Sequence, residues 1–221
     1  MTFHIRSLTV LLAAVALILG VGVASVDATL LSTMGSVFPV PDEPDPTGGA
    51  VVSGSGVVVP FATSGFSGTL TSTVLSGDPS NAWGGLTFTY LLTNDSVSSN
   101  ALTRMTVENF TGFLTDVSYQ TGSGGIAPSL ADRLTDDVVG FSFLPTGVPT
   151  ASGVLTPGSD SALLVVQTDA TVYAATSAFV IDGDVVNVGS FAPIPEPGSF
   201  CLAVLGVVCL SGYAWRRRSM A

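Results

Sequence analysis

Residues 86–93 read Leu-Thr-Phe-Thr-Tyr-Leu-Leu-Thr, and this stretch decides the fold class. Large apolar side chains stand at every second position from Leu86 to Leu92, and threonines stand at positions 87 and 89 between them. Successive side chains of a β-strand point to opposite faces of the sheet. The alternation therefore predicts a strand with one apolar face and one polar face.

The same alternation recurs along the middle of the chain, with turn-forming residues between the segments. Further strands are expected at 66–74, 113–120, 139–143, 161–168, 172–181 and 185–192. Glycine, proline, asparagine and aspartate mark turns at 76–79, 93–95, 121–125, 156–158 and 182–184. Residues 129–134 are the one place where we expect a short helical turn.

Seven to nine short strands with frequent turns predict an all-β fold. We expect an antiparallel β-sandwich of the immunoglobulin or fibronectin-like kind, formed by residues 50–192. The side chains expected in its core are those on the apolar faces of the strands, namely Phe66, Leu70, Phe88, Tyr90, Leu92, Phe110, Phe141, Phe143, Leu164, Val166 and Phe179.

The beginning of the chain resembles an export signal. Arg6 precedes an apolar run from Leu8 to Ala24, and small residues offer cleavage sites after Ala24 or Ala28. This layout predicts a signal peptide over residues 1–28, and a retained membrane anchor is the alternative. Residues 29–49 are then an N-terminal linker, because four prolines and three acidic residues crowd the stretch from 39 to 46.

Charge and residue types limit what the expected mature segment can do. Residues 29–194 hold 14 acidic side chains and two arginines, a net charge of −12, and no lysine, histidine or cysteine. Such a surface repels phosphate backbones, so we expect no nucleic-acid partner. The missing residue types remove most nucleophile–base pairs and most transition-metal sites, so the sequence predicts a protein that is not an enzyme, with no metal site and no cofactor.

The end of the sequence combines three features in order. Pro195-Glu196-Pro197 comes first, an uncharged run from Phe200 to Trp215 follows, and Arg216, Arg217 and Arg218 come directly after it. An apolar segment of this length predicts a transmembrane helix, here over about 198–215. The arginine cluster predicts a stop-transfer signal that stays in the cytoplasm, with the middle segment facing out.

Residues 193–221 resemble the PEP-CTERM sorting domain, a motif also named the ice-binding protein C-terminal domain. The resemblance implies recognition at Pro195, Glu196 and Pro197 by an exosortase, a membrane-embedded processing enzyme with a cysteine nucleophile. It also implies residence in a bacterial envelope or an exopolysaccharide-rich extracellular matrix. Two prolines fix φ and remove amide donors, so the tripeptide suits an extended shape that an enzyme cleft can bind.

The expected mature segment offers two kinds of candidate ligand site. Calcium is one possible ligand, because acids cluster at Asp132, Asp136 and Asp137, at Asp182 and Asp184, and at Asp42, Glu43 and Asp45. Trp83 lies in a loop rich in glycine, asparagine and proline, where it is a possible platform for sugar rings. A tryptophan that simply covers the end of the core is the competing explanation.

These observations predict an exported, non-enzymatic envelope or extracellular-matrix protein with a structural or adhesive role. The tail would hold it transiently in the membrane until processing. The first alternative is a carbohydrate-binding module for exopolysaccharide, and the second is a retained single-pass membrane protein.

Overall fold

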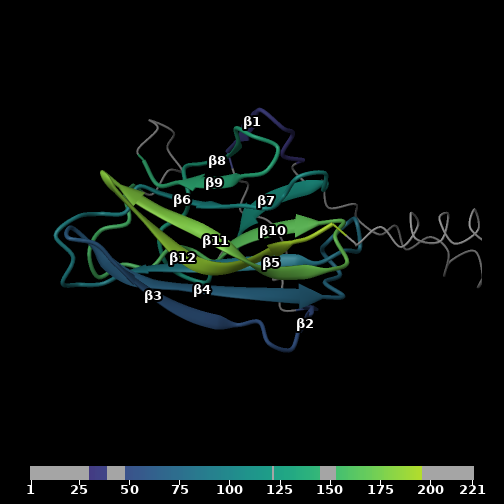
Figure 1. Ribbon diagram of the computed structural model, residues 1–221, viewed down its shortest axis with the longest axis horizontal. Helices are drawn as coiled ribbons and strands as arrows, with labels where there is room; N and C mark the ends of the chain where they lie inside the picture. The colour runs from purple at the N-terminus through teal and green to yellow at the C-terminus, as the bar shows by residue number, and fades with distance from the viewer. Residues whose placement is uncertain (1–29, 39–47, 121, 145–152, 196–221) are drawn as a thin grey trace, which may run out of the picture.

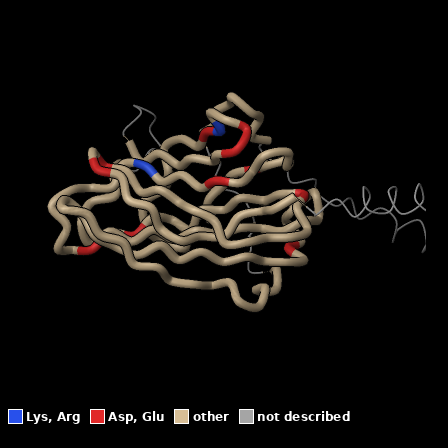
Figure 2. The backbone as a smooth tube through the Cα atoms, in the orientation of Figure 1, with Lys and Arg blue, Asp and Glu red and all other residues tan. Residues whose placement is uncertain are grey.

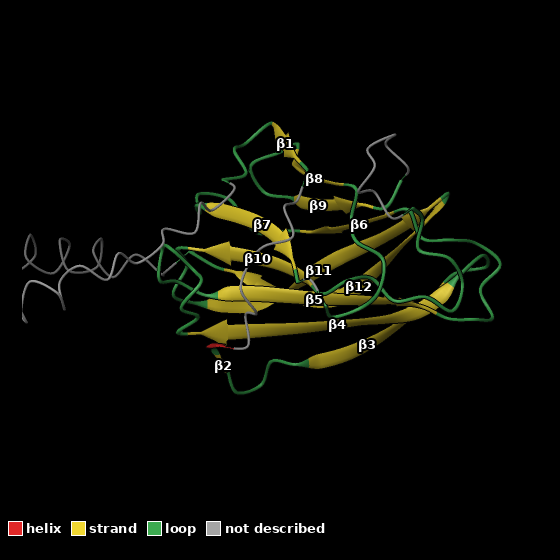
Figure 3. Cartoon of the chain, turned by 180° about the vertical axis from the view of Figure 1, so that it is seen from behind, coloured by secondary structure: helices red, strands yellow, loops and turns green. Residues whose placement is uncertain are grey.

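The computed structural model describes residues 30–38, 48–120, 122–144 and 153–195. These residues form twelve strands in two antiparallel sheets (Figures 1 and 3). The prediction of an all-β, antiparallel protein is therefore confirmed, while the immunoglobulin or fibronectin-like kinship stays a prediction. The expected signal peptide and the expected helix over 198–215 lie outside the described residues, within which no helix is long and apolar enough to cross a membrane.

The first sheet has the order β2-β4-β5-β10-β7, with β3 also paired to β4. Its strands are β2 (Ala50–Val51), β3 (Val57–Ala62), β4 (Ser67–Ser76), β5 (Thr87–Asn94), β7 (Thr115–Tyr119) and β10 (Leu164–Thr168). β2 and β3 lie end to end along the same edge of β4, because the turn between them breaks the pairing. Gly54 and Gly56 have φ angles of 89° and 83° in that turn, a region that favours glycine.

The second sheet has the order β1-β8-β9-β6-β11-β12. Its strands are β1 (Gly35–Val37), β6 (Arg104–Val107), β8 (Leu130–Arg133), β9 (Val139–Ser142), β11 (Tyr173–Asp182) and β12 (Asp184–Pro193). The long hairpin of β11 and β12 closes at Asp182 and Asp184, with Gly183 in the left-handed region between them. β12 is thus an edge strand, and it lies beside β3 and β4 of the first sheet.

One core joins the two sheets. Leu70, Phe88 and Val166 of the first sheet belong to the same buried cluster as Met105 and Phe141 of the second. Burying large apolar side chains is the dominant favourable term in folding, at roughly 1.5–3 kcal/mol for each one. Ten of the eleven predicted core residues are fully or almost fully buried, whereas Phe179 is only half-buried and the prediction for it is wrong. The reason is register: Ala178 and Val180 take the inward positions on β11, so Phe179 points to the other face.

The structure corrects two other expectations, one about residues 129–134 and one about the linker. Residues 129–134 do not form a helical turn, because Leu130–Arg133 pairs with β1 on one side and β9 on the other. Part of the segment assigned to a linker, 29–49, contributes to the fold. Leu31 is fully buried in the core and Gly35–Val37 is strand β1. The remaining residues of that segment, 39–47, lie outside the described part of the chain.

Candidate functional site

The last strand leads directly into the predicted sorting motif. Pro193, the last residue of β12, is buried, and the backbone N–H of Ile194 donates to the carbonyl of Val172 at 3.1 Å. Pro195 is exposed and is the last described residue before 196–221. The hydrogen-bonded fold therefore ends at Ile194, directly before the first residue of Pro195-Glu196-Pro197.

Contacts to both sheets hold the end of β12. The N–H of Phe191 donates to Ser72 Oγ at 3.2 Å, and its carbonyl accepts from Tyr90 Oη at 2.8 Å. The Phe191 ring packs edge-on against Tyr173 with ring centres 5.6 Å apart. Burial raises the pKa of the Tyr90 hydroxyl well above its ordinary value, because the phenolate would lose its water. The hydroxyl therefore stays protonated and keeps donating to β12.

Three segments lie together at the end of the domain where the chain leaves the fold. They are the turn 77–86 between β4 and β5, the turn 169–172 between β10 and β11, and residues 111–114 before β7. Leu86 donates to the carbonyl of Ala170 at 2.7 Å, and Leu114 donates to Asp169 Oδ1 at 3.0 Å. We call these segments, together with Ile194 and Pro195, the tail-side end. Leu114 and Val172 expose 45% and 36% of their surface there.

Two buried polar side chains shape the turn that carries Trp83. Asn81 Nδ2 donates to the carbonyls of Gly85 and Thr168 at 3.1 and 3.0 Å, and its Oδ1 accepts from the N–H of Trp83. The Asp78 carboxylate accepts from Ser80, Thr87 and Gln167. Trp83 itself is partly buried. Buried hydrogen bonds thus tie the turn to the rest of the tail-side end, and the role of Trp83 as a sugar platform stays a prediction.

Both arginines among the described residues form ion pairs and hydrogen bonds within the fold. Arg104 forms a bidentate pair with Asp132 at 2.6 and 2.7 Å. Arg133 is almost fully buried and donates to the carbonyls of Phe110, Phe113 and Asp136. Figure 2 shows that red acidic positions are spread along the described chain while blue basic positions are scarce. Anionic ligands therefore find no unpaired arginine or lysine among the described residues.

Four of the five described acids in the candidate calcium clusters bind other groups of the fold, and the fifth, Asp182, is the last residue of β11. Asp132 and Asp136 each face an arginine, and Asp137 Oδ1 accepts from the N–H of Asn109 at 3.0 Å. Asp184 Oδ2 accepts from Ser64 Oγ across the tip of the β11–β12 hairpin. The described residues bring together no group of three or more His, Cys, Asp or Glu side chains. Asp42, Glu43 and Asp45 lie outside the described residues.

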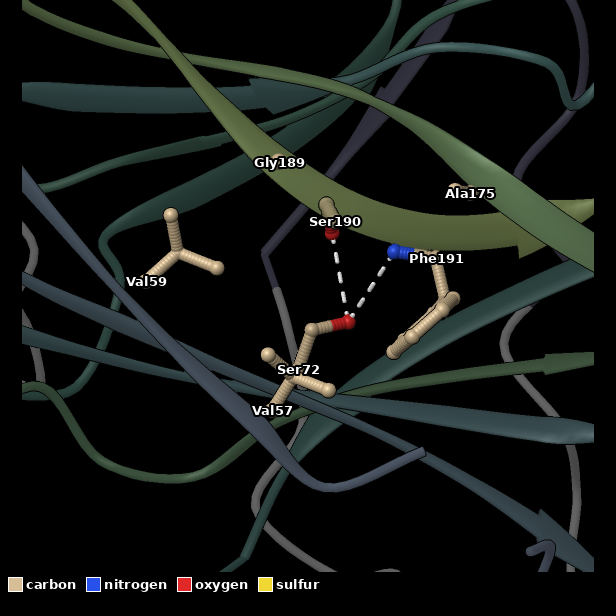
Figure 4. A pocket seen from close by; sticks show the side chains of 7 residues that line it. All are labelled: Val57, Val59, Ser72, Ala175, Gly189, Ser190 and Phe191. Carbon is tan, nitrogen blue, oxygen red and sulfur yellow. Dashed lines mark hydrogen bonds between the residues drawn. The ribbon is translucent and has the colours of Figure 1, made fainter. Parts of the chain in front are cut away.

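A pocket of about 190 Å³ lies where β12 passes β3 and β4 (Figure 4). Two serines line the pocket, and Ser190 Oγ donates to Ser72 Oγ at 3.2 Å. Ser72 Oγ also accepts from the N–H of Phe191. The remaining lining residues are Val57, Val59, Ala175 and Gly189. The pocket is thus mainly apolar, and its two hydroxyls are already bonded to the protein.

The structure thus places Trp83 and Pro195 at the same end of the domain, although 112 positions separate them along the chain. Glu196, Pro197 and the cluster Arg216, Arg217 and Arg218 lie outside the described residues. Sequence reasoning missed Leu114 and Val172 as members of this end. No local pattern distinguishes them, because each is one apolar residue at the edge of a predicted strand.

Comparison with protein families identifies a motif at the end of the chain. Residues 193–218 match the family model described as the PEP-CTERM protein-sorting motif. No curated protein and no solved structure gives a significant match to the chain. The match begins at the last residue of β12, so the folded domain and the sorting signal adjoin. The chain therefore carries a PEP-CTERM protein-sorting motif over residues 193–218.

Proposed function

We propose that this chain is an exported, non-enzymatic protein of a bacterial envelope or extracellular matrix, and that an exosortase processes its tail near Pro195–Pro197. The sorting motif supports export and recognition by an exosortase. The two-sheet domain is the cargo, with a structural or adhesive role. The apolar segment after the motif holds it in the membrane until processing, with the arginines on the cytoplasmic side.

The observation that carries this proposal is the exposure of Pro195 directly after a strand end that both sheets hold. An extended proline-containing segment can dock in an enzyme groove where it is exposed and not paired within the fold. Processing breaks a peptide bond near the motif: an acceptor, either water or an amine, takes the acyl group on the domain side. The tail keeps the new amino end. The domain needs no unfolding for this step.

A non-enzymatic role is supported by the residue types of the domain. The expected mature segment has no histidine, lysine or cysteine, and both of its arginines form ion pairs. A serine or threonine there has only a carboxylate as a possible base. A structural or adhesive role needs none of these groups.

Mass spectrometry of the protein from cells with an active exosortase tests the proposal. We expect residues after the motif to be absent from the mature form, and Glu196→Ala to keep them attached. Pro157→Ala, which removes an exposed turn proline far from the motif, is the matched control and should be processed normally. A mature chain that still carries residues 199–221 would contradict the proposal.

A further inference from the structure

The fold holds the end of β12 firmly up to the start of the sorting motif. β12 is paired with β11 as far as Pro193, and Ile194 adds one more backbone hydrogen bond to Val172. Fraying this end would also break the bonds of Phe191 to Ser72 and Tyr90. Hydrogen bonds therefore hold the described chain as far as Ile194, directly before Pro195.

The length of chain beyond Pro195 limits how far the domain can stand from a membrane. Five residues connect Pro195 to Phe200, where the uncharged run starts, and they span at most about 18 Å when extended. The headgroup layer on each side of a bilayer is about 6 Å thick. With the tail inserted, as in the proposed function on which this inference rests, the tail-side end lies within about 12 Å of the headgroups.

The tail-side end also has side chains that suit this position. Leu114 and Val172 are exposed apolar residues, and the hydrogen-bonded turn 77–86 presents a partly buried tryptophan, Trp83. Tryptophan and apolar side chains favour the membrane–water interface. The opposite end carries four acids, Asp95, Asp160, Asp182 and Asp184, which an anionic membrane surface would repel. The tail-side end as defined above carries one exposed acid, Asp169, and its Oδ1 accepts from the N–H of Leu114.

We propose that the tail-side end docks on the bilayer surface while the tail is inserted, with Trp83, Leu114 and Val172 at the headgroup layer. The partner is the lipid surface itself. Docking holds Pro195 at the height where a membrane-embedded enzyme reaches the motif, and cleavage then releases the domain. The domain is thus positioned for processing by its own end surface as well as by its tail.

Fluorescence of the full chain in phosphatidylcholine vesicles tests this proposal. The protein has two tryptophans, so Trp215→Phe leaves Trp83 as the single reporter. Lipids with a nitroxide near the headgroup should reduce Trp83 emission about twofold, because an interfacial tryptophan contacts these lipids. In the same background, Val172→Asp should restore most of the emission.

Val97→Asp is the matched control, because Val97 is an exposed valine, with 83% of its surface accessible, in the β5–β6 loop at the opposite end. It should leave the quenching unchanged, and circular dichroism checks that both variants are folded. Equal quenching in the two variants, or no quenching of Trp83 in protein that floats with the vesicles, would overturn the docking proposal alone. Failure to float with vesicles would overturn tail insertion, and docking with it.

Discussion

Arg104 crosses strand β9 to reach Asp132 on β8, and its guanidinium lies directly over Gly140. Nη1 and Nη2 of Arg104 lie 2.6 and 2.7 Å from the two carboxylate oxygens of Asp132, and Nη1 also donates to Ser142 Oγ. A Cβ at position 140 would overlap Nη2 and Cζ of Arg104. Because residue 140 on β9 is a glycine, the guanidinium of Arg104 on β6 has room to pass over it and reach Asp132 on β8.

Gly140→Ala should destabilise the domain by about 1–2 kcal/mol, because it displaces Arg104 from a nearly buried carboxylate. Urea unfolding of the full chain measures the change. The control is the same substitution in a background with Arg104→Ala and Asp132→Ala, where its cost should fall to about 0.5 kcal/mol or less. An equal cost in both backgrounds would show that the ion pair is not what requires glycine.

Asn81→Ala should cost about 2–3 kcal/mol in free energy of unfolding, because it leaves the buried carbonyls of Gly85 and Thr168 without a donor. The fluorescence of Trp83 should also shift, since Asn81 Oδ1 orders the backbone of that residue. Asn187→Ala removes one exposed hydrogen bond, to Ser177 Oγ, and should change stability by less than about 0.5 kcal/mol. Similar losses in the two variants would contradict the assigned role of Asn81.

Gly189→Ala should stabilise the domain by about 0.5–1 kcal/mol, because alanine loses less backbone entropy than glycine on folding. The added Cβ would meet only Val59 Cγ2, at the ordinary contact distance of 3.9 Å, beside the pocket. Gly68→Ala in β4 is the comparison variant. It should destabilise the domain, because the added Cβ would overlap the carbonyl oxygen of Thr93. Thermal unfolding of both variants measures the two changes, which should have opposite signs.

Tyr90→Phe should cost about 1 kcal/mol near neutral pH, because the carbonyl of Phe191 loses its donor. Burial raises the pKa of Tyr90 in the folded state, so its contribution is complete below about pH 10, the ordinary tyrosine pKa. Above that pH the unfolded chain releases the proton while the folded chain keeps it, so stability falls as pH rises.

Unfolding in urea at a series of pH values tests this sign. The difference in stability between the wild type and Tyr90→Phe should shrink as the pH increases from about 9 to 11. A difference that stays constant over this range would show that Tyr90 does not keep its proton in the folded protein.

Strands with a clear alternation could be predicted, and strands without one could not. The stretch around Phe88 and Tyr90 shows its pattern locally, and β5 lies where it was expected. Val57–Ala62 has no alternation and contains Pro60, yet it forms β3 because it lies at an edge, where a missing N–H is tolerated. Leu130–Arg133 is a strand only because β1 and β9 pair with it on both sides.

The candidate site was predictable only in part. Pro195-Glu196-Pro197 is a local signal, so its position along the chain was readable from the sequence. The buried arginine Arg133 was not foreseen, because its partners are carbonyl groups of Phe110, Phe113 and Asp136, which no residue pattern reveals. Leu114 and Val172 were missed for a similar reason, because they lie at the tail-side end only through contacts with segments distant in the sequence.

The sequence by itself determined the β class, the acidic character without histidine, lysine or cysteine, and the sorting motif, because each depends on residue type and local order. Only the tertiary structure decided that Trp83 and Val172 share an end with Pro195, and that Arg104 reaches Asp132 over Gly140. These relationships join residues from distant segments. Strand register and packing bring them together, and a one-residue shift in pairing would separate them.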